Sequence, residues 1–321
     1  MKWYFKIIIF FIILAILVEL LAIPLFPNKK NLFKYGFFNS TMFELLNEEE
    51  NTIDTLMVGD SLVYSSISPT LIYEKYGFTS YDCSLSSQTM KESYQYLTLG
   101  IRSQNPKVVF LETNMFFRDP DSNKRKIKDI KKVKYMLPFY VLHNNWKKIL
   151  GGSDAWIDYN KGFRYIAKFN PAKKSDIENY RKDRRDDKTI IKDENMYYLK
   201  KIIELCDEHN IKLILISNPS IKAWSMKKHE IVSKIAKDYN LEWLDLNTLL
   251  DIDWINDTKD EGEHLNHRGA EISTYYVGEY LLKSNLVVSH KNDPKYQKWD
   301  RAVELYKENN KETKKEKILI K

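Results

Sequence analysis

Three side chains that could together carry out acyl transfer stand far apart in the sequence. Ser61 lies in the run GDSL, Asn114 ends the run LETN, and His264 lies in a polar loop nearer the carboxyl end. A serine hydroxyl becomes a good nucleophile when a neighbouring base takes its proton, and histidine is the side chain most often used for this. An amide can donate hydrogen bonds to the oxygen on which negative charge develops. The three residues therefore predict a serine nucleophile, provided that the fold brings them together.

The elements that must position these residues can be read from the apolar pattern. Short apolar runs bounded by turn residues predict five buried parallel strands, at 55–58, 78–82, 107–111, 212–217 and 241–246. Apolar residues at helical spacing predict intervening and following helices, at 69–76, 89–103, 194–209, 226–239 and 270–282. We expect an α/β fold with a central parallel sheet and helices on both faces. Functional groups gather at the carboxyl ends of such strands, which is where the candidates lie.

Four short runs resemble the sequence blocks of the SGNH/GDSL hydrolase superfamily. GDSL at 59–62 is similar to the nucleophile block, and YDCSLSSQ at 81–88 is similar to the glycine block, with Ser87 in place of the glycine. LETN at 111–114 is similar to the G-x-N block, with Glu112 in the glycine position. DEGEHLNHRGA at 260–270 is similar to the D-x-x-H block. The resemblance covers about residues 54–117 and 210–285.

This resemblance implies a three-layer, flavodoxin-like fold and a Ser-His-acid mechanism with Ser61 as nucleophile and His264 as base. It also implies three donors to the oxyanion: the backbone N–H of Ser61, a backbone N–H near Ser87 and the side-chain amide of Asn114. The serine at position 87 keeps the backbone N–H but restricts φ where glycine would be free. No cofactor is implied.

The carboxylate that would support His264 is open between three residues. The family's spacing places an aspartate three residues before the histidine, and Glu261 holds that position here. We favour Asp260, one residue further back, because aspartate is the family's usual residue and Gly262 gives the loop freedom to absorb one extra residue. Glu263, beside the histidine, is the third candidate. A carboxylate in this place would hold the histidine tautomer and stabilise the imidazolium.

His267 offers a second histidine, which we expect to be an exposed residue in the first turn of a helix. Glu263, His264 and His267 also suggest a metal site. The zinc-protease pattern, however, needs His-Glu-x-x-His with the histidines four residues apart on one helix, and here they are three apart across a loop-to-helix junction. We therefore expect no metal.

The net charge of +7 is unevenly distributed. Residues 118–192 carry a net +11 and residues 286–321 carry +4, whereas the rest of the chain is acidic. Such a segment either attracts a polyanion or is a solvated helical surface. No zinc-finger, RRM or basic-zipper pattern accompanies it, so nucleic acid is not the expected partner. Trp146 and Trp156 within it could stack on sugars or pack in the core.

The amino-terminal end predicts a membrane anchor. Residues 7–26 are apolar apart from Glu19, and a helix of twenty residues is about 30 Å long, which matches the bilayer core. Lys2 and Lys6 precede the run, and no small-x-small cleavage site follows it. We expect an uncleaved single-pass anchor with the rest of the chain extracytoplasmic. Glu19 either contacts a membrane partner or lies neutral near the headgroups.

These patterns predict four parts of the chain: a transmembrane anchor at 1–27, a juxtamembrane stalk at 28–52 with a short helix at 41–50, a catalytic domain at 53–285 with a helical basic insertion at 118–192, and a charged tail at 286–321. Only two cysteines are present, Cys83 and Cys206, which excludes a four-cysteine zinc site and leaves a single disulfide open.

The anchor and the motifs together resemble membrane-tethered members of the superfamily that add or remove acyl groups on cell-surface polymers such as teichoic acids and alginate. The resemblance implies an acyltransferase or esterase that acts on O-acyl groups, acetyl or similar, of a surface polysaccharide or teichoic-acid-type polymer. A polytopic membrane-bound O-acyltransferase is the implied partner. The alternative is a non-catalytic accessory subunit of such an acyltransferase. The departures at Ser87, Glu112 and Glu261 favour the alternative, whereas the intact Ser61, Asn114 and His264 oppose it.

Overall fold

The computed structural model of the protein describes residues 2–22, 42–122, 146–182 and 189–310. The chain forms two compact units. One contains residues 1–48 and 124–158, and the other contains residues 49–123 and 159–321.

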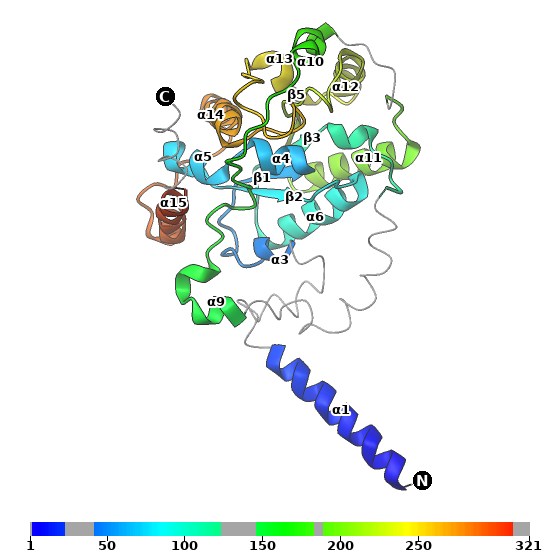
Figure 1. The fold of residues 1–321 in the computed structure, drawn as a ribbon, viewed down its shortest axis with the longest axis vertical. Helices are drawn as coiled ribbons and strands as arrows, with labels where there is room; N and C mark the ends of the chain where they lie inside the picture. Colours follow the sequence, from blue (N-terminus) through cyan, green and yellow to red (C-terminus); the bar gives the residue numbers. More distant parts are fainter. Residues whose placement is uncertain (1, 23–41, 123–145, 183–188, 311–321) are drawn as a thin grey trace. The chain divides into compact units, whose positions relative to one another are not determined.

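The second unit is built on a five-stranded parallel sheet with the strand order β2-β1-β3-β4-β5 (Figure 1). Its strands are β1 (Thr55–Gly59), β2 (Ser80–Ser84), β3 (Val108–Glu112), β4 (Lys212–Ser217) and β5 (Glu242–Asp245). The first three strands are buried at every position, as the near-continuous apolar runs predicted. The predicted α/β class and parallel sheet are confirmed, and the strand order is that of flavodoxin-like folds.

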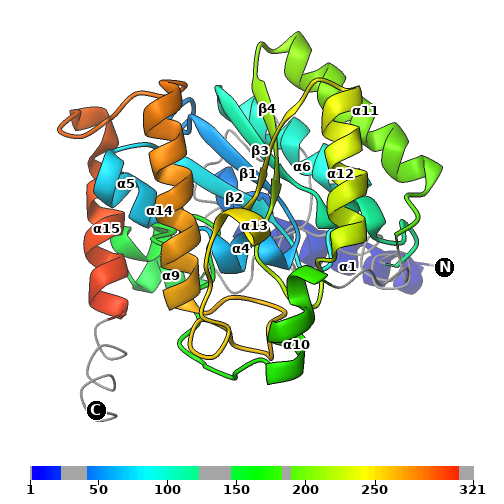
Figure 2. The same cartoon turned by 90° about the horizontal axis from the view of Figure 1, so that it is seen from above.

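Helices cover both faces of the sheet (Figure 2). On one face lie α6 (Met90–Ser103), α11 (Asp193–Glu208) and α12 (Met226–Asp238), and on the other lie α4 (Ser61–Ser66), α5 (Pro69–Tyr76), α14 (His267–Ser284) and α15 (Gln297–Asn309). The register pairs Gly59 with Ser84 and Val58 with Leu111, so the carboxyl ends of the first three strands are aligned. The residues that follow these strands therefore meet at one edge of the sheet.

Most element boundaries agree with the sequence, and the differences have local causes. The strand predicted at 78–82 lies at 80–84, because its ladder with β1 begins where Ser80 pairs with Thr55. The helix predicted from residue 270 begins at His267, because the Asn266 side chain accepts the backbone N–H groups of the next turn. Cys83 and Cys206 are buried, free thiols.

The predicted charged tail contains a packed helix. In α15 the buried residues recur at helical spacing, at Trp299, Ala302, Val303 and Tyr306. Trp299 is 2% exposed, and its ring centroid lies 5.2 Å from that of Tyr73 on α5. Residues 297–309 therefore complete the second unit, while 311–321 lie outside the described residues.

The second half of the predicted basic insertion is part of the framework of the second unit. Its only α-helix within residues 159–182 is the short α10 (Lys174–Asn179). The backbone N–H of Asp82 donates to the carbonyl of Lys161 at 3.0 Å, which covers the free edge of β2. The backbone N–H of Asn170 donates to the carbonyl of Thr258 at 3.0 Å. The carbonyl of Asn170 accepts the backbone N–H of Glu261 at 3.1 Å. This segment thus supports the loop that carries His264.

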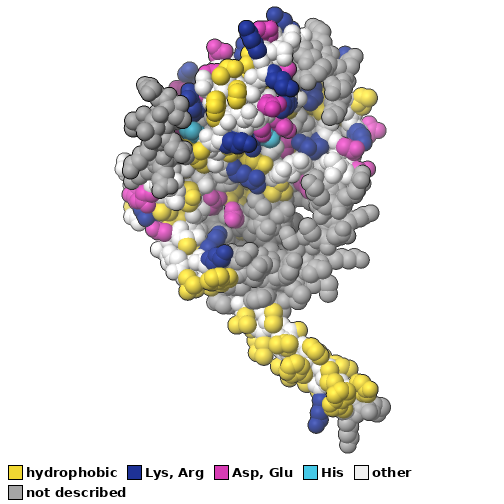
Figure 3. All heavy atoms as spheres, viewed as in Figure 1, with side chains coloured by type: hydrophobic (Ala, Val, Ile, Leu, Met, Phe, Trp, Pro, Cys, Tyr) yellow, Lys and Arg dark blue, Asp and Glu magenta, His cyan; other side chains and the backbone are white. Residues whose placement is uncertain are grey.

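The first unit contains α1 (Lys2–Ala22), α3 (Met42–Leu45), α9 (Trp146–Leu150) and the 3-10 helix η4 (Ser153–Trp156). Hydrophobic side chains are exposed along α1 (Figure 3). In the described part of the chain, no helix reaches the length and apolar character needed to cross a membrane. Residues 23–27 of the predicted anchor and 28–41 of the predicted stalk lie outside the described residues.

Candidate active site

Ser61 lies directly after the carboxyl end of β1, as the first residue of α4. Asp60 caps this short helix, because its Oδ1 accepts the backbone N–H of Leu62 at 3.0 Å. Gly59 allows a close approach to β3, since an added Cβ would lie 2.5 Å from the Cβ of Glu112. The run GDSL therefore sets the serine hydroxyl at the edge where the strand ends meet.

The hydroxyl of Ser61 is in hydrogen-bond contact with His264, 203 positions further along the chain. The distance from Ser61 Oγ to His264 Nε2 is 2.8 Å. The other ring nitrogen, Nδ1, lies 2.7 Å from Asp260 Oδ2, and Asp260 Oδ1 accepts the backbone N–H of His264 at 2.7 Å. With Nδ1–H donating to the carboxylate, Nε2 is left to accept the serine proton.

Asp260 is suited to remain ionised in this place. Half-burial of its carboxyl raises the pKa, but the hydrogen bonds from the ring and backbone of His264 lower it by more, so the pKa lies below its ordinary value. A carboxylate that keeps its charge can stabilise a protonated imidazole beside it. Lys259 Nζ, 3.8 Å from Asp260 Oδ2, adds to the same effect.

The other two candidate carboxylates do not contact the histidine ring in this way. Glu261 lies at a positive φ of 60°, and its carboxylate pairs with Lys222 at 3.5 Å. Glu263 is exposed, and its carboxylate belongs to a cluster with Asp260 and His264 whose ligand atoms lie within 4.8 Å of one another. In that cluster the ring nitrogens of His264 are hydrogen-bonded to Asp260 and Ser61, so a metal ion would have to displace one of these contacts.

His267 was expected to be exposed in the first turn of a helix. It does begin α14, but it is 9% exposed, which corrects that expectation. Its Nδ1 lies 3.1 Å from the carbonyl oxygen of Ile166, and its ring stacks on Tyr165 with centroids 4.9 Å apart. The segment 159–172, which sequence analysis assigned to the insertion, thus provides the contacts that bury it.

The expected oxyanion donors lie on the two neighbouring strand ends. Ser87 follows β2 in a turn and has a φ of 55°, the left-handed conformation for which glycine is the easiest residue. The turn is tied to β1 by a hydrogen bond from Leu85 N–H to the carbonyl of Gly59 at 3.4 Å. Asn114 follows β3, and its side-chain amide donates to Asp60 Oδ2 at 3.0 Å. An amide has two hydrogens, so one remains for a substrate oxygen.

Asp60 is a buried carboxylate whose charge is compensated by long-range contacts. Its side chain is fully buried, and its Oδ2 accepts both the amide of Asn114 and the guanidinium of Arg118, the latter at 2.5 Å. Buried charges persist only when they are paired and hydrogen-bonded in this way. Arg118, which the sequence presented as the start of a basic segment, therefore orients the residue next to the candidate nucleophile.

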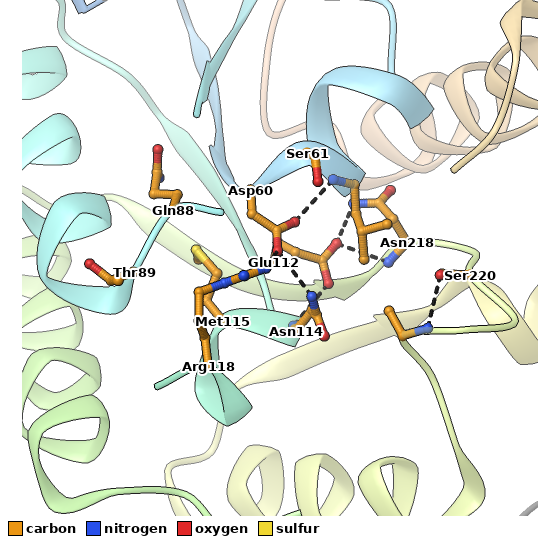
Figure 4. A network of polar contacts seen from close by, with 12 residues as sticks. Asp60, Ser61, Gln88, Thr89, Glu112, Asn114, Met115, Arg118, Asn218 and Ser220 are labelled. Atoms are coloured by element: carbon orange, nitrogen blue, oxygen red, sulfur yellow. Dashed lines mark hydrogen bonds and ion pairs between the residues drawn. The ribbon is translucent and has the colours of Figure 1, made fainter. Parts of the chain in front are cut away.

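Glu112 is a second buried carboxyl group beneath the site (Figure 4). Its Oε1 accepts the backbone N–H of Asn114 at 3.1 Å, and its Oε2 accepts the backbone N–H of Asn218 at 3.0 Å and the side-chain amide of Asn218. Burial and the nearby charge of Asp60 raise the pKa of Glu112 to about 8, against the opposing effect of these hydrogen bonds. Burial therefore shifts the balance of Glu112 toward its protonated form.

Further polar residues at the ends of β4 and β5 were missed by the sequence analysis. Ser217 ends β4, and its Oγ lies 2.5 Å from Thr113 Oγ1. Asp245 ends β5, and its Oδ2 lies 2.6 Å from Nδ1 of His229 on α12. The rule that functional groups follow strand ends could have selected Ser217, Asn218 and Asp245, because it applies to all five strands.

No protein-family model matches the chain, and no curated protein matches it. Solved structures give several similarities. A GDSL-like lipase from Bacteroides thetaiotaomicron is 11% identical, with a TM-score of 0.41 over 81% of this chain and 99% of that one. An acetyl xylan esterase is 15% identical, with a TM-score of 0.38 over 72% of this chain and 99% of that one.

A lipase/acylhydrolase from Enterococcus faecalis is also similar. It is 11% identical, with a TM-score of 0.36 over 73% of this chain and 97% of that one. Likenesses of this extent assign neither a family nor an activity to the chain, so the chemistry must be inferred from its own residues.

Proposed function

We propose that the protein is a serine acyl-enzyme that transfers or hydrolyses O-acyl groups. The observation that carries this proposal is the continuous hydrogen-bonded chain from Ser61 Oγ through the ring of His264 to Asp260, with distances of 2.8 and 2.7 Å. The three residues come from the end of β1 and from one loop before α14. A serine, a histidine and a carboxylate in this order form the arrangement that activates a hydroxyl for attack on an acyl carbon.

The proton transfers follow from this geometry. As Ser61 Oγ forms a bond to the carbonyl carbon, its proton passes to His264 Nε2, and Asp260 stabilises the imidazolium. The tetrahedral intermediate collapses when the bond to the alcohol oxygen breaks, and His264 returns its proton to that oxygen. The acyl group is then held as an ester on Ser61. Water or a second hydroxyl, deprotonated by His264, attacks this ester and regenerates the free serine.

The negative charge on the carbonyl oxygen needs donors at the same edge of the sheet. The candidates are the backbone N–H of Ser61, a backbone N–H in the turn at Ser87 and the second amide hydrogen of Asn114. The contact from Asn114 to Asp60 fixes the rotation of the amide, so its remaining N–H has a defined direction before substrate binds. Donors fixed in advance stabilise the transition state without reorganising during the reaction.

We assign to this activity a substrate on the cell surface: O-acyl groups, acetyl or similar, of a polysaccharide or teichoic-acid-type polymer. Two features support this part of the proposal. The apolar run at residues 7–26, which extends beyond the described helix α1, suits a membrane anchor, and we propose that it holds the second unit outside the cytoplasm. The net charge of +11 in residues 118–192 suits an anionic polymer or a membrane surface. A polytopic membrane O-acyltransferase is the partner we propose.

The test uses the full-length protein in detergent. We expect a fluorophosphonate probe to label the wild type, and p-nitrophenyl acetate to be hydrolysed with an acyl-enzyme intermediate. Ser61→Ala should abolish labelling, and His264→Ala should lower it together with kcat by at least about a thousandfold. Ser86→Ala, at an exposed serine in the turn after β2, is the matched control and should behave as the wild type.

Undiminished labelling in Ser61→Ala would overturn the assignment of the nucleophile. A wild type that is folded, neither labels nor hydrolyses, and co-purifies with a polytopic acyltransferase would instead support the non-catalytic accessory role.

A further inference from the structure

A small hollow lies beside the candidate nucleophile, at the carboxyl ends of β3 and β4 and against α12. Leu62, which follows Ser61, and Asn114 both line it. Phe117, Trp224, Asn218 and His229 line the remainder of the wall. The hollow has a volume of about 20 Å³, which is enough for one water-sized group. It therefore has room for a single functional group of a bound molecule.

One acceptor that lines this hollow, Asn218 Oδ1, has no hydrogen-bond donor among the described residues. Asn218 is 2% exposed, and its side-chain nitrogen and backbone N–H both donate to Glu112. Its Oδ1 accepts no hydrogen bond from any residue that the structure describes. Buried amide oxygens in proteins nearly always have a donor, so a donor from outside the chain is expected here.

His229 supplies a second acceptor. Its Nδ1 lies 2.6 Å from Asp245 Oδ2, which also accepts the indole N–H of Trp224 at 3.1 Å. When Nδ1–H donates to the carboxylate, Nε2 carries a lone pair. Within residues 42–122, 146–182 and 189–310 no hydrogen bond to this Nε2 is found, and the side chain is 29% exposed.

These surroundings select the kind of group that can enter. Two acceptors without donors disfavour a phosphate or carboxylate, which brings only lone pairs. An acyl methyl group would leave the Asn218 oxygen unsatisfied. An ammonium group would meet the positive charge of Lys228, which also lines the hollow. A hydroxyl group is neutral, is of the right size, and donates to one acceptor while its carbon contacts the aromatic walls.

We propose that this hollow is a hydroxyl subsite. It takes one free hydroxyl of a polyol or sugar whose acylated oxygen lies at Ser61. This inference rests on the proposed function. The free hydroxyl displaces a water molecule and donates to Asn218 Oδ1 or His229 Nε2. The subsite thereby distinguishes esters of polyhydroxylated alcohols from esters of simple alcohols. In a transfer reaction the same contacts would orient the acceptor alcohol for attack on the acyl-enzyme.

The test compares two esters with the same acyl group, glycerol monoacetate and ethyl acetate, on the full-length protein. We expect the wild type to prefer glycerol monoacetate in kcat/KM. At least one of His229→Phe and Asn218→Ala, whichever removes the acceptor that the hydroxyl uses, should reduce this preference about tenfold, the value of one hydrogen bond. Lys234→Ala, at an exposed lysine on α12, is the control and should retain the wild-type ratio. A ratio that stays within twofold of the wild type in both variants would overturn the subsite.

A wild type that turns over neither ester contradicts the proposed function, and the subsite is then judged by binding alone. Saturation-transfer NMR with glycerol on Ser61→Ala protein measures this without turnover. Transfer that is lost when His229→Phe or Asn218→Ala is added, but kept when Lys234→Ala is added, supports the subsite. Equal transfer in all four proteins overturns it and leaves a hollow that holds only water.

Discussion

Asp260 holds His264 at two points: its Oδ1 accepts the backbone N–H and its Oδ2 lies by the ring nitrogen Nδ1, each at 2.7 Å. The two residues are four positions apart, whereas the D-x-x-H block that this run resembles has a spacing of three. The loop absorbs the additional residue in two consecutive positive φ angles, 60° at Glu261 and 89° at Gly262. This local winding turns Glu261 toward Lys222 and leaves Asp260 beside the imidazole.

The two carboxylates can be separated by matched substitutions. Asp260→Asn removes the charge that stabilises the imidazolium and allows the wrong tautomer, so kcat/KM for p-nitrophenyl acetate should fall by about 10³–10⁴-fold. Glu261→Gln leaves the histidine contacts intact and should stay within about twofold of the wild type. Steady-state kinetics of both full-length variants gives the comparison. A larger loss in Glu261→Gln than in Asp260→Asn would reverse the assignment.

Asn114 tests whether its amide acts on the reaction or only on the fold. Asn114→Ala removes the donor that we assign to the oxyanion, so kcat should fall by about 10²–10³-fold with little change in KM. The same variant removes a hydrogen bond to Asp60, whose charge Arg118 still compensates. Thermal unfolding should therefore show a folded protein. A kcat within threefold of wild type, measured beside the Ser86→Ala control, would leave Asn114 with a structural role only.

The sequence could predict those features of the fold and site that depend on the local pattern of apolar and polar residues. Buried strands and amphipathic helices follow from the spacing of apolar residues, and the position of Ser61 after a strand follows from that pattern. The contact between Ser61 and His264 was expected because Ser61 follows the first strand and His264 lies in the loop before the last predicted helix of the sheet domain, and the structure places them 2.8 Å apart. Their catalytic roles stay predictions until they are measured.

The parts that sequence could not predict depend on contacts between distant residues. Arg118 looks like the start of a basic segment until the fold brings it to Asp60, 58 positions earlier. Glu112 looks like a departure from a motif, and only its burial reveals a carboxyl group whose pKa is raised. The helix at 297–309 is rich in charge, so its four buried residues become a packing face only when α5 is present to cover them.

Trp299 tests whether the carboxyl-terminal helix is integral to the second unit. Its ring packs on Tyr73 and lies 4.6 Å from the ammonium of Lys161, so Trp299→Ala leaves a large cavity. We expect a loss of about 3–5 kcal/mol in the free energy of unfolding, measured with urea. The control is Val288→Ala, at a side chain that is 66% exposed, which should change the free energy of unfolding by less than about 0.5 kcal/mol. A loss below about 1 kcal/mol in Trp299→Ala would show that the helix is dispensable.

Glu112 should make the stability of the protein depend on pH in an identifiable window. Its pKa rises from 4.5 to about 8 on folding, because the carboxyl is buried near the charge of Asp60. Between these two values the folded chain holds a proton that the unfolded chain has released. The free energy of unfolding therefore falls as the pH rises through this window, by at most about 1.4 kcal/mol per pH unit. The pKa of Asp260 is lowered on folding, so this carboxyl makes the free energy of unfolding fall as the pH decreases. Its effect is confined to pH values below its ordinary pKa of 3.8.

Glu112→Gln removes this titration and isolates its contribution. Urea unfolding at pH 5, 6, 7 and 8 should show that the wild type loses stability relative to the variant with each step. Glu208→Gln, at an exposed glutamate on α11, should keep the wild-type slope. Parallel curves for the wild type and Glu112→Gln would mean that Glu112 does not take up a proton on folding in this range, which would overturn the prediction.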